Sequence, residues 1–159
     1  EDTLEAVKRE IPYAFGQSLY PGVPDIRLIL IDRIKAFSVG DIRLIPLAAW
    51  HHKMPVLGFR MGDFSYLTDA NSLEKGTLEK MKGSSVVIIN ALRQSPHHSH
   101  FSLSQALDII KELSPAKAYI THISHQMGLS AQVQQSLPEG VALAFDGLCF
   151  KAAYKPVSE

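Results

Sequence analysis

The chain lacks several features that would place it quickly in a class of proteins. Its 159 residues hold one cysteine, Cys149, which excludes an internal disulfide and a cysteine-rich zinc site and makes a reducing, cytoplasmic setting the expectation. No window reaches the apolar length of a membrane span, and the first residues are acidic and polar, unlike a signal peptide. Lys plus Arg and Asp plus Glu both number 16, and this zero net charge argues against a general nucleic-acid binder.

Two common catalytic motifs are also missing. There is no Gly-x-x-x-x-Gly-Lys-Ser/Thr loop to cradle a nucleotide phosphate. A serine hydrolase needs a Gly-x-Ser-x-Gly turn after a strand, whereas Gly83-Ser84-Ser85 precedes a predicted strand. The absence of both motifs leaves metal-assisted chemistry as the class to examine.

The apolar patterns predict an antiparallel front half followed by an alternating strand–helix back half. We expect strands over residues 26–31, 34–39, 42–47, 56–61, 64–67, 86–89, 118–120, 141–145 and 148–153, and helices over 3–10, 73–81, 103–113 and 126–137. The last two strands would form a hairpin about Asp146-Gly147. This order predicts an α/β fold with a mixed sheet, in a single domain over residues 1–159.

Polar residues that can bind metal follow several of the predicted strands. All seven histidines lie within residues 51–125, in three groups that come after strands: His51 and His52; His97, His98 and His100; His122 and His125. Asp69 also follows a strand, the one that ends at Leu67. Strand ends at one edge of a helix-covered sheet converge on a single crevice, so we expect these side chains to meet there. Imidazoles held in this way can be metal ligands, acid–base groups or phosphate contacts.

A hydrolytic site with two metal ions needs imidazoles to hold the ions and a carboxylate between them. Asp69 suits the bridging position, because Thr68-Asp69 at a strand end is short and rigid. Such a site polarises a phosphoryl or acyl oxygen and lowers the pKa of a bound water.

At these residues the sequence resembles a known family. The matching segments run in the same order over about two thirds of the chain: His51-His-Lys-Met-Pro-Val-Leu-Gly-Phe-Arg60, Tyr66-Leu-Thr-Asp69, Ala91-Leu-Arg-Gln-Ser-Pro-His-His-Ser-His100, Tyr119-Ile-Thr-His-Ile-Ser-His125, Leu137-Pro-Glu-Gly140 and Phe145-Asp-Gly-Leu148. The chain looks like the C-terminal part of a metallo-β-lactamase-fold hydrolase of the PhnP-like phosphodiesterase group, similar in layout to ribonuclease Z. The resemblance implies part of an αββα sandwich.

The resemblance also implies roles for individual residues. His51 would bind one metal ion, His122 would bind the second, and Asp69 would bridge both. His100 would contact the substrate phosphate or protonate the leaving group. The spacing to Pro55 and Gly58 favours His51 as the ligand over His52, which we expect to be exposed.

Three further residues have less central roles by the same resemblance. Asp146 would orient a ligand imidazole, as carboxylates behind metal sites often do. His97 and His125 would line the pocket, or His97 would cap its own loop. Asn90 stands where relatives usually have Asp, and we expect its neutral amide to weaken a supporting role there.

The family's His-x-His-x-Asp-His motif, which supplies most of the metal ligands, is absent, and no histidine precedes His51. The chain therefore resembles the later part of the family domain, and we expect weak or partial metal occupancy and no competent hydrolysis by the chain alone. The absence of the first half would leave an apolar sheet face uncovered. We expect a homodimer or a partner segment on that face.

The resemblance favours a metal-dependent phosphodiesterase that acts on a small cyclic or linear phosphodiester. Its complete site would use two divalent ions, zinc or manganese, because His and Asp ligands suit both. Two alternatives stay open: a non-catalytic fragment or binding module of the same fold, and a metallo-hydrolase of a thioester, a lactone or a tRNA 3′ end.

Overall fold

The computed structural model describes residues 2–15, 22–24, 26–152 and 154. They belong to two compact units, Glu1–Asp32 and Arg33–Glu159, which we describe separately. That residues 1–159 form one domain stays a prediction. No helix among the described residues has the length and apolar character needed to cross a bilayer.

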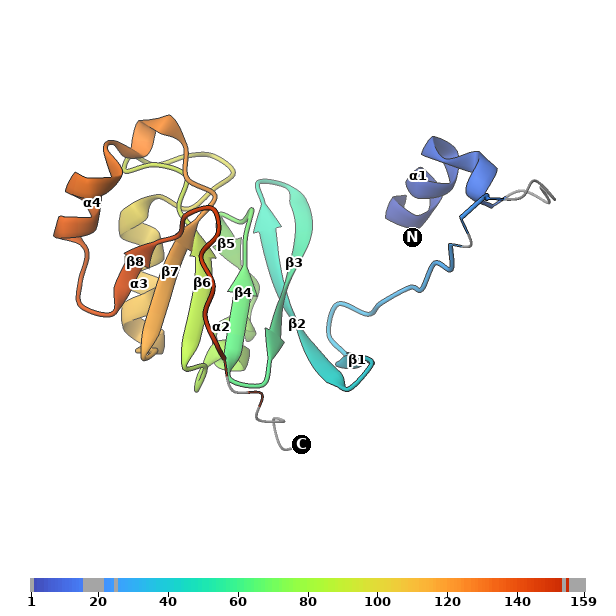
Figure 1. Cartoon of the computed structure of the whole chain (residues 1–159), viewed down its shortest axis with the longest axis horizontal. Helices are drawn as coiled ribbons and strands as arrows, with labels where there is room; N and C mark the ends of the chain where they lie inside the picture. The colour runs from blue at the N-terminus through green and yellow to red at the C-terminus, as the bar shows by residue number, and fades with distance from the viewer. Residues whose placement is uncertain (1, 16–21, 25, 153, 155–159) are drawn as a thin grey trace. The chain divides into compact units, whose positions relative to one another are not determined.

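The first unit contains a short helix and an extended stretch (Figure 1). Helix α1 (Asp2–Glu10) confirms the predicted helix, and a 3-10 turn, η1 (Pro12–Ala14), follows it. The strand predicted over residues 26–31 is wrong, because the structure has no strand there and leaves Ile29 and Leu30 69% and 60% exposed. An apolar run becomes a strand only when another strand pairs with its backbone.

The second unit is built on a mixed sheet in the order β1-β2-β3-β4-β6-β7-β8, with β5 paired to β2. Strands β1 to β4 pair antiparallel, and β4, β6, β7 and β8 pair parallel, which confirms the predicted mixed sheet. The strands are β1 (Phe37–Val39), β2 (Ile42–His51), β3 (Met54–Met61), β4 (Phe64–Leu67), β5 (Ser72–Leu73), β6 (Val86–Asn90), β7 (Lys117–Thr121) and β8 (Val141–Leu143).

The helices of this unit are α2 (Thr77–Met81), α3 (Leu103–Leu113), η2 (His125–Met127) and α4 (Ser130–Ser136). Helix α3 has its predicted bounds, because Ser102 and Gln105 form a capping box and Ser114 ends the helix in a left-handed conformation. The helix predicted over 73–81 begins at Thr77, since Leu73 belongs to β5. The helix predicted over 126–137 is divided at Gly128, whose φ of +104° no helix allows.

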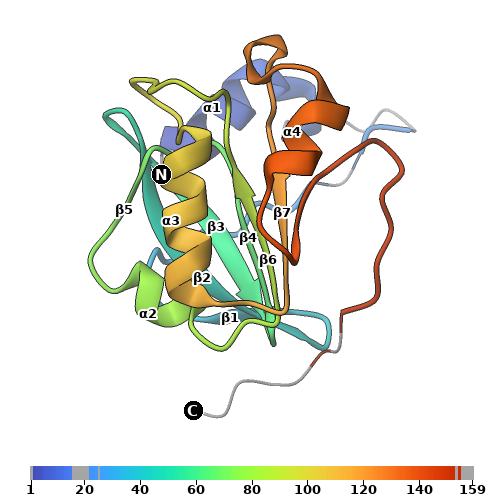
Figure 2. The same ribbon diagram turned by 90° about the vertical axis from the view of Figure 1, so that its left-hand side faces the viewer.

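The two faces of the sheet differ in what covers them (Figures 1 and 2). Helix α3 packs on one face, over a core that includes Leu67, Ile89 and Ile120. Residues 145–152 cross the other face, where Phe150 stacks on Tyr119 with 5.3 Å between ring centroids. The predicted hairpin about Asp146-Gly147 is wrong: the turn forms, but residues 148–152 form no strand, and Ala153 lies outside the described residues.

The strand directions bring four carboxyl ends to one edge of the sheet. Strand β2 is antiparallel to β3 and β3 is antiparallel to β4, so β2 runs in the same direction as β4. Strands β6 and β7 are parallel to β4. The residues that follow β2, β4, β6 and β7 therefore lie at a common edge, where open α/β sheets bind ligands.

Candidate metal centre

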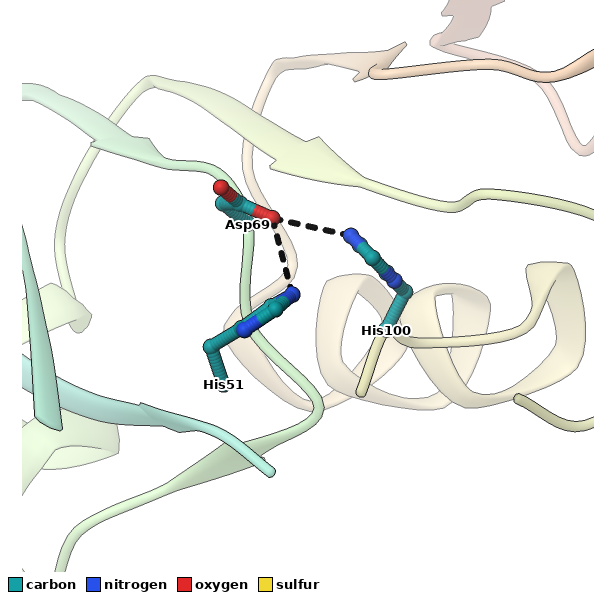
Figure 3. A group of neighbouring side chains, drawn as sticks. All are labelled: His51, Asp69 and His100. Atoms are coloured by element: carbon teal, nitrogen blue, oxygen red, sulfur yellow. Dashed lines mark hydrogen bonds and ion pairs between the residues drawn. The ribbon is translucent and has the colours of Figure 1, made fainter. Parts of the chain in front are cut away.

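Four of the predicted residues meet at this edge. His51 is the last residue of β2, Asp69 lies two residues beyond β4, His100 lies in the loop between β6 and α3, and His122 directly follows β7. Figure 3 shows the imidazoles of His51 and His100 directed at the carboxylate of Asp69. Each side chain is thus carried by a different strand end of the same sheet.

One oxygen atom is the centre of this cluster. The Oδ1 atom of Asp69 lies 2.8 Å from Nε2 of His100, 3.3 Å from Nε2 of His51 and 3.6 Å from Nε2 of His122. The Nε2 atoms of His100 and His122 are 3.1 Å apart, and their rings stack with 4.8 Å between centroids. Three imidazole nitrogens therefore surround a single carboxylate oxygen.

The backbone is left-handed at two of the four residues. Asp69 has a φ of 60° and His122 a φ of 56°, values that few residues other than glycine adopt. Asp and His tolerate this region better than most residues, and such conformations are concentrated at functional sites. The turn away from extended geometry aims each side chain across the sheet edge.

Close polar contacts surround both ring nitrogens of His100. The backbone N–H of Ser99 donates to Nδ1 of His97, which makes that nitrogen an acceptor. Nδ1 of His100 lies 3.0 Å from the same atom and 2.9 Å from the Ser99 hydroxyl, which can donate to it or accept from it. Nε2 of His100 faces Oδ1 of Asp69 at 2.8 Å, a hydrogen-bond distance at which a protonated Nε2 donates to the carboxylate.

Burial favours the neutral form of His100. Loss of hydration lowers the pKa of His100, against the raising effect of its hydrogen bond to Asp69, and the nearby His122 lowers the pKa further. Loss of hydration also lowers the pKa of His97, with His98 and Arg93 adding to the effect. A neutral Nε2 lone pair 2.8 Å from a carboxylate oxygen is repulsive unless a proton or a metal ion lies between them.

The donor set fits a divalent ion. Ligand atoms about 2.0–2.1 Å from a tetrahedral zinc ion lie about 3.3 Å from one another. The four separations given above, from 2.8 to 3.6 Å, span this value. Within the described part of the chain, His51, Asp69 and His100 form a group whose ligand atoms all lie within 4.8 Å of one another.

Two asparagine side chains fix the backbone around Asp69 through hydrogen bonds. Buried Asn90, the last residue of β6, accepts a hydrogen bond from the Ala70 N–H and donates one to the Ala70 carbonyl, both 3.0 Å long. Asn71 accepts from the backbone N–H of His52 and donates to the carbonyl of His98. Asn71 was not predicted as part of the site, although its place two residues after Asp69 in the same loop was a signal.

The remaining predicted residues lie around this cluster. His97 contacts His100 and also caps its own loop through the Ser99 N–H. His52 is exposed, as expected, and its ring meets that of His98 at 5.7 Å. Asp146 lines a cavity of about 250 Å³ together with His122 and makes no hydrogen bond to an imidazole among the described residues. His125 begins η2 and is exposed, and no described contact joins it to Asp69.

Comparisons with known proteins point to one superfamily. Residues 1–123 match a family model described as a beta-lactamase superfamily domain. The crystal structure of a new diphosphatase from the PhnP family is 28% identical, with a TM-score of 0.82 over 93% of this chain and 54% of that one. YhfI from Bacillus subtilis, a metallo-beta-lactamase fold protein, superposes with a TM-score of 0.64 at 17% identity, over 76% of this chain and 54% of that one, and supports the fold alone.

A curated protein carries a different name. An octanoyltransferase from Porphyromonas gingivalis (strain ATCC BAA-308 / W83) is 29% identical over 149 residues, which are 93% of this chain and 30% of that protein. The chain thus spans less than a third of this curated relative and about half of each solved relative.

Proposed function

The chain belongs to the beta-lactamase superfamily, and from this premise we propose that it carries half of a divalent-metal site that hydrolyses phosphoesters. The observation that carries the proposal is the convergence of three imidazole Nε2 atoms on Oδ1 of Asp69. The similarity to a PhnP-family diphosphatase supports phosphoester or phosphoanhydride substrates, and the expected substrate is a small cyclic or linear phosphodiester.

In this proposal each residue of the cluster has a distinct task. Asp69 and His51 would hold one divalent ion, and Asp69 and His122 would hold part of the coordination of a second. When bound, a divalent ion, zinc or manganese, supplies polarisation of a phosphoryl oxygen and lowers the pKa of a water molecule. His100 holds or releases a proton at Nε2 beside the reacting group, because that atom faces Asp69 Oδ1 at 2.8 Å while Nδ1 contacts His97 and Ser99.

His100 is also positioned to be a metal ligand. The two roles predict different metal contents for the variant His100→Ala. If His100 acts on the substrate and does not bind the ion, the variant His100→Ala keeps its metal. If His100 is a ligand, His100→Ala loses the metal as His51→Ala does. In both roles, Nε2 of His100 lies beside Oδ1 of Asp69, together with the Nε2 atoms of His51 and His122.

Metal content tests the proposal directly. After incubation with zinc or manganese and removal of free ions, elemental analysis of the chain should give at most one ion per molecule, and Asp69→Asn should lose it. His125→Ala is the matched control, since it removes an imidazole that lies outside the cluster. Two tightly held ions per chain, or metal content that Asp69→Asn leaves unchanged, would contradict the half-site.

The name of the curated relative favours a second candidate, chemistry on an acyl group. Residual hydrolysis of bis(p-nitrophenyl) phosphate by the chain, compared with that of a thioester and a lactone, separates the candidates. A covalent acyl route would need a nucleophile beside a base, and Cys149, which is exposed, has no imidazole contact among the described residues. Faster turnover of the thioester than of the phosphodiester would replace the phosphoesterase proposal.

A further inference from the structure

The side chain of Arg93 joins two of the loops that carry the imidazoles of the cluster. It lies in the loop between β6 and α3, and each of its three nitrogen atoms donates a hydrogen bond. Nη2 donates to the carbonyl of Pro96 at 2.7 Å, Nε to the carbonyl of Ser95 at 3.3 Å, and Nη1 to Oε1 of Gln126 at 2.8 Å. The first two acceptors belong to the same loop as Arg93, whereas Gln126 lies in η2, after β7.

The backbone of Arg93 is itself fixed, at the base of its loop. Its carbonyl accepts from the N–H of Leu103, the first residue of α3, at 2.9 Å. The loop between β6 and α3 therefore starts and ends beside Arg93, and it carries His97 and His100 between these two points. A side chain anchored at the base can hold the rest of the loop, and the Pro96 carbonyl that it binds directly precedes His97.

Two contacts to the backbone support the junction between the same two loops. The Gln94 side chain donates to the carbonyl of Met127 at 2.9 Å. The backbone N–H of Ser124 donates to the carbonyl of Leu92, also at 2.9 Å. Ser124 lies two residues after His122, so the connection that follows β7 is held against the loop after β6 close to this imidazole.

The rings of His100 and His122 depend on the separation of these two loops. Their Nε2 atoms are 3.1 Å apart, and the rings stack with 4.8 Å between centroids. His122 has a left-handed φ of 56°, a conformation that persists only where surrounding contacts hold it. Because each ring comes from one of the loops that Arg93 joins, a change in loop separation changes the distance between the two nitrogens.

The chemistry of the Arg93 side chain suits a rigid connection. The three acceptors are uncharged, and hydrogen bonds from a charged donor are stronger than those between neutral groups. The guanidinium is planar and directs its donors in fixed directions, so three acceptors bound at once are fixed relative to one another. A lysine at this position would keep the charge without this geometry.

We propose that Arg93 is a positioning residue, whose hydrogen bonds to Pro96 and Gln126 set the separation of the two loops and so hold His100 and His122 ready for a divalent ion. The inference rests on the proposed function for the identity of the ligand, but its claim about the loops applies to the metal-free chain as well. Side chains that support metal-binding residues from outside typically change metal affinity by about 10- to 100-fold.

Zinc affinity, measured by competition with a chromophoric chelator, tests the proposal. We expect Arg93→Met to weaken zinc binding about tenfold, and Arg93→Lys to restore little of the loss because it restores only the charge. Gln126→Leu should also weaken zinc binding. The double variant of Arg93→Met and Gln126→Leu should bind zinc no more weakly than Arg93→Met alone, because both substitutions break the same hydrogen bond.

Arg60 provides a matched control at the opposite edge of the sheet. Like Arg93, it donates three hydrogen bonds that join loops, in this case to the carbonyls of Gly62, Lys80 and Lys82. Arg60→Met should therefore lower the free energy of unfolding in urea and leave zinc affinity unchanged. Unchanged zinc affinity in Arg93→Met, or an equal loss in Arg60→Met, would overturn the positioning role.

The metal-free protein separates this inference from the proposed function. In EDTA at one pH, stacking should shift the ring-proton resonances of His100 and His122, and Arg93→Met should move them toward the values of a free imidazole, while Arg60→Met should not. Zinc binding and ring resonances that Arg93→Met leaves intact would overturn the positioning role alone. Ring resonances that respond to Arg93→Met, in a chain that binds no zinc, would overturn the metal site alone.

Discussion

Asn90 illustrates how much of the site depends on single polar side chains outside the cluster. Its amide is fully buried and forms two hydrogen bonds with the backbone of Ala70, the residue after Asp69. The structure thus gives this amide a role that a carboxylate cannot fill, because a carboxylate has no donor for the Ala70 carbonyl. The neutral side chain that we expected to weaken support of the site fixes its central loop.

We predict that Asn90→Asp destabilises the protein by about 3 kcal/mol at neutral pH, because it buries a charge and leaves the Ala70 carbonyl with one partner fewer. Burial would raise the pKa of the introduced carboxyl, so the loss relative to wild type at the same pH should shrink as pH falls. Urea unfolding at several pH values measures this. Asn71→Asp, which is half-buried, should lose less, and an equal loss in both variants would contradict the explanation.

The histidines give the metal-free protein a pH dependence of known sign. The folded-state pKa of His100 and of His97 is lowered, so the unfolded chain binds protons first as pH falls through about 6.5. The free energy of unfolding should therefore be highest above that pH and decrease as the pH is lowered further. In EDTA, urea unfolding at pH 7.5 and 5.5 should show the difference, and His100→Phe should reduce it, while His125→Ala should not.

At the scale of elements, the spacing of β3 and β4 determines where Asp69 lies. A Cβ atom on Gly58 of β3 would lie 2.5 Å from the Tyr66 carbonyl and 2.8 Å from a Leu67 methyl group. Both atoms belong to β4, which ends two residues before Asp69. The absence of a side chain at residue 58 therefore lets the two strands approach closely enough to place the carboxylate at the cluster.

We predict that Gly58→Ala destabilises the protein by about 2 kcal/mol, as overpacking in a core does, and lowers metal binding because β4 must shift. Gly40→Ala is the control, since a Cβ there meets open space but its φ is +56°. That variant should lose about 1 kcal/mol from backbone strain and keep its metal content. Metal binding unchanged in Gly58→Ala would show that Asp69 does not depend on this contact.

The elements that the sequence predicted well are those whose local signals agree with their packing. Helix α3 has a capping box and an apolar face, and β6 is a continuous apolar run that both faces of the sheet bury. Residues 26–31 and 148–152 have similar apolar character but form no strand, because pairing depends on distant residues that composition does not reveal.

The candidate site could be predicted from the sequence about as far as the secondary structure could. Strand ends predicted which loops carry His51, Asp69, His100 and His122, and the structure brings these four side chains together, while their roles stay predictions. The sequence could not show that His100 contacts Asp69 directly, that Asn71 joins two loops, or that Asp146 makes no hydrogen bond to an imidazole among the described residues. Each of these depends on side-chain direction at a left-handed or irregular residue.

At the scale of the whole molecule, the sheet face opposite α3 is partly covered. Phe150 packs against Tyr119 and Phe64, but Tyr66 remains 38% exposed on the same face. The chain spans about half of each solved relative, so the activity of those proteins does not transfer to it directly. The expected homodimer or partner segment stays a prediction.

We predict that the chain self-associates through this face, because an exposed aromatic surface gains from burial. Light scattering over a range of concentrations should show a dimer, and Tyr66→Lys should shift it toward monomer. Leu129→Lys is the control, since Leu129 is 68% exposed on the loop before α4. A monomer at every concentration would contradict the prediction.

The hydrogen bonds of the segment Asp69–Asn71 determine how the loops around the cluster can open. The Ala70 carbonyl accepts from the Phe101 N–H as well as from Asn90, and the Asn71 N–H donates to the Trp50 carbonyl. The end of strand β2 and the loops after β4 and β6 therefore share one junction, and neither loop can open without breaking its hydrogen bonds to the other parts. We therefore predict that in hydrogen exchange the amides of Ala70, Asn71 and Phe101 form one cooperative unit, and that an ion bound at Asp69 slows the exchange of all three together.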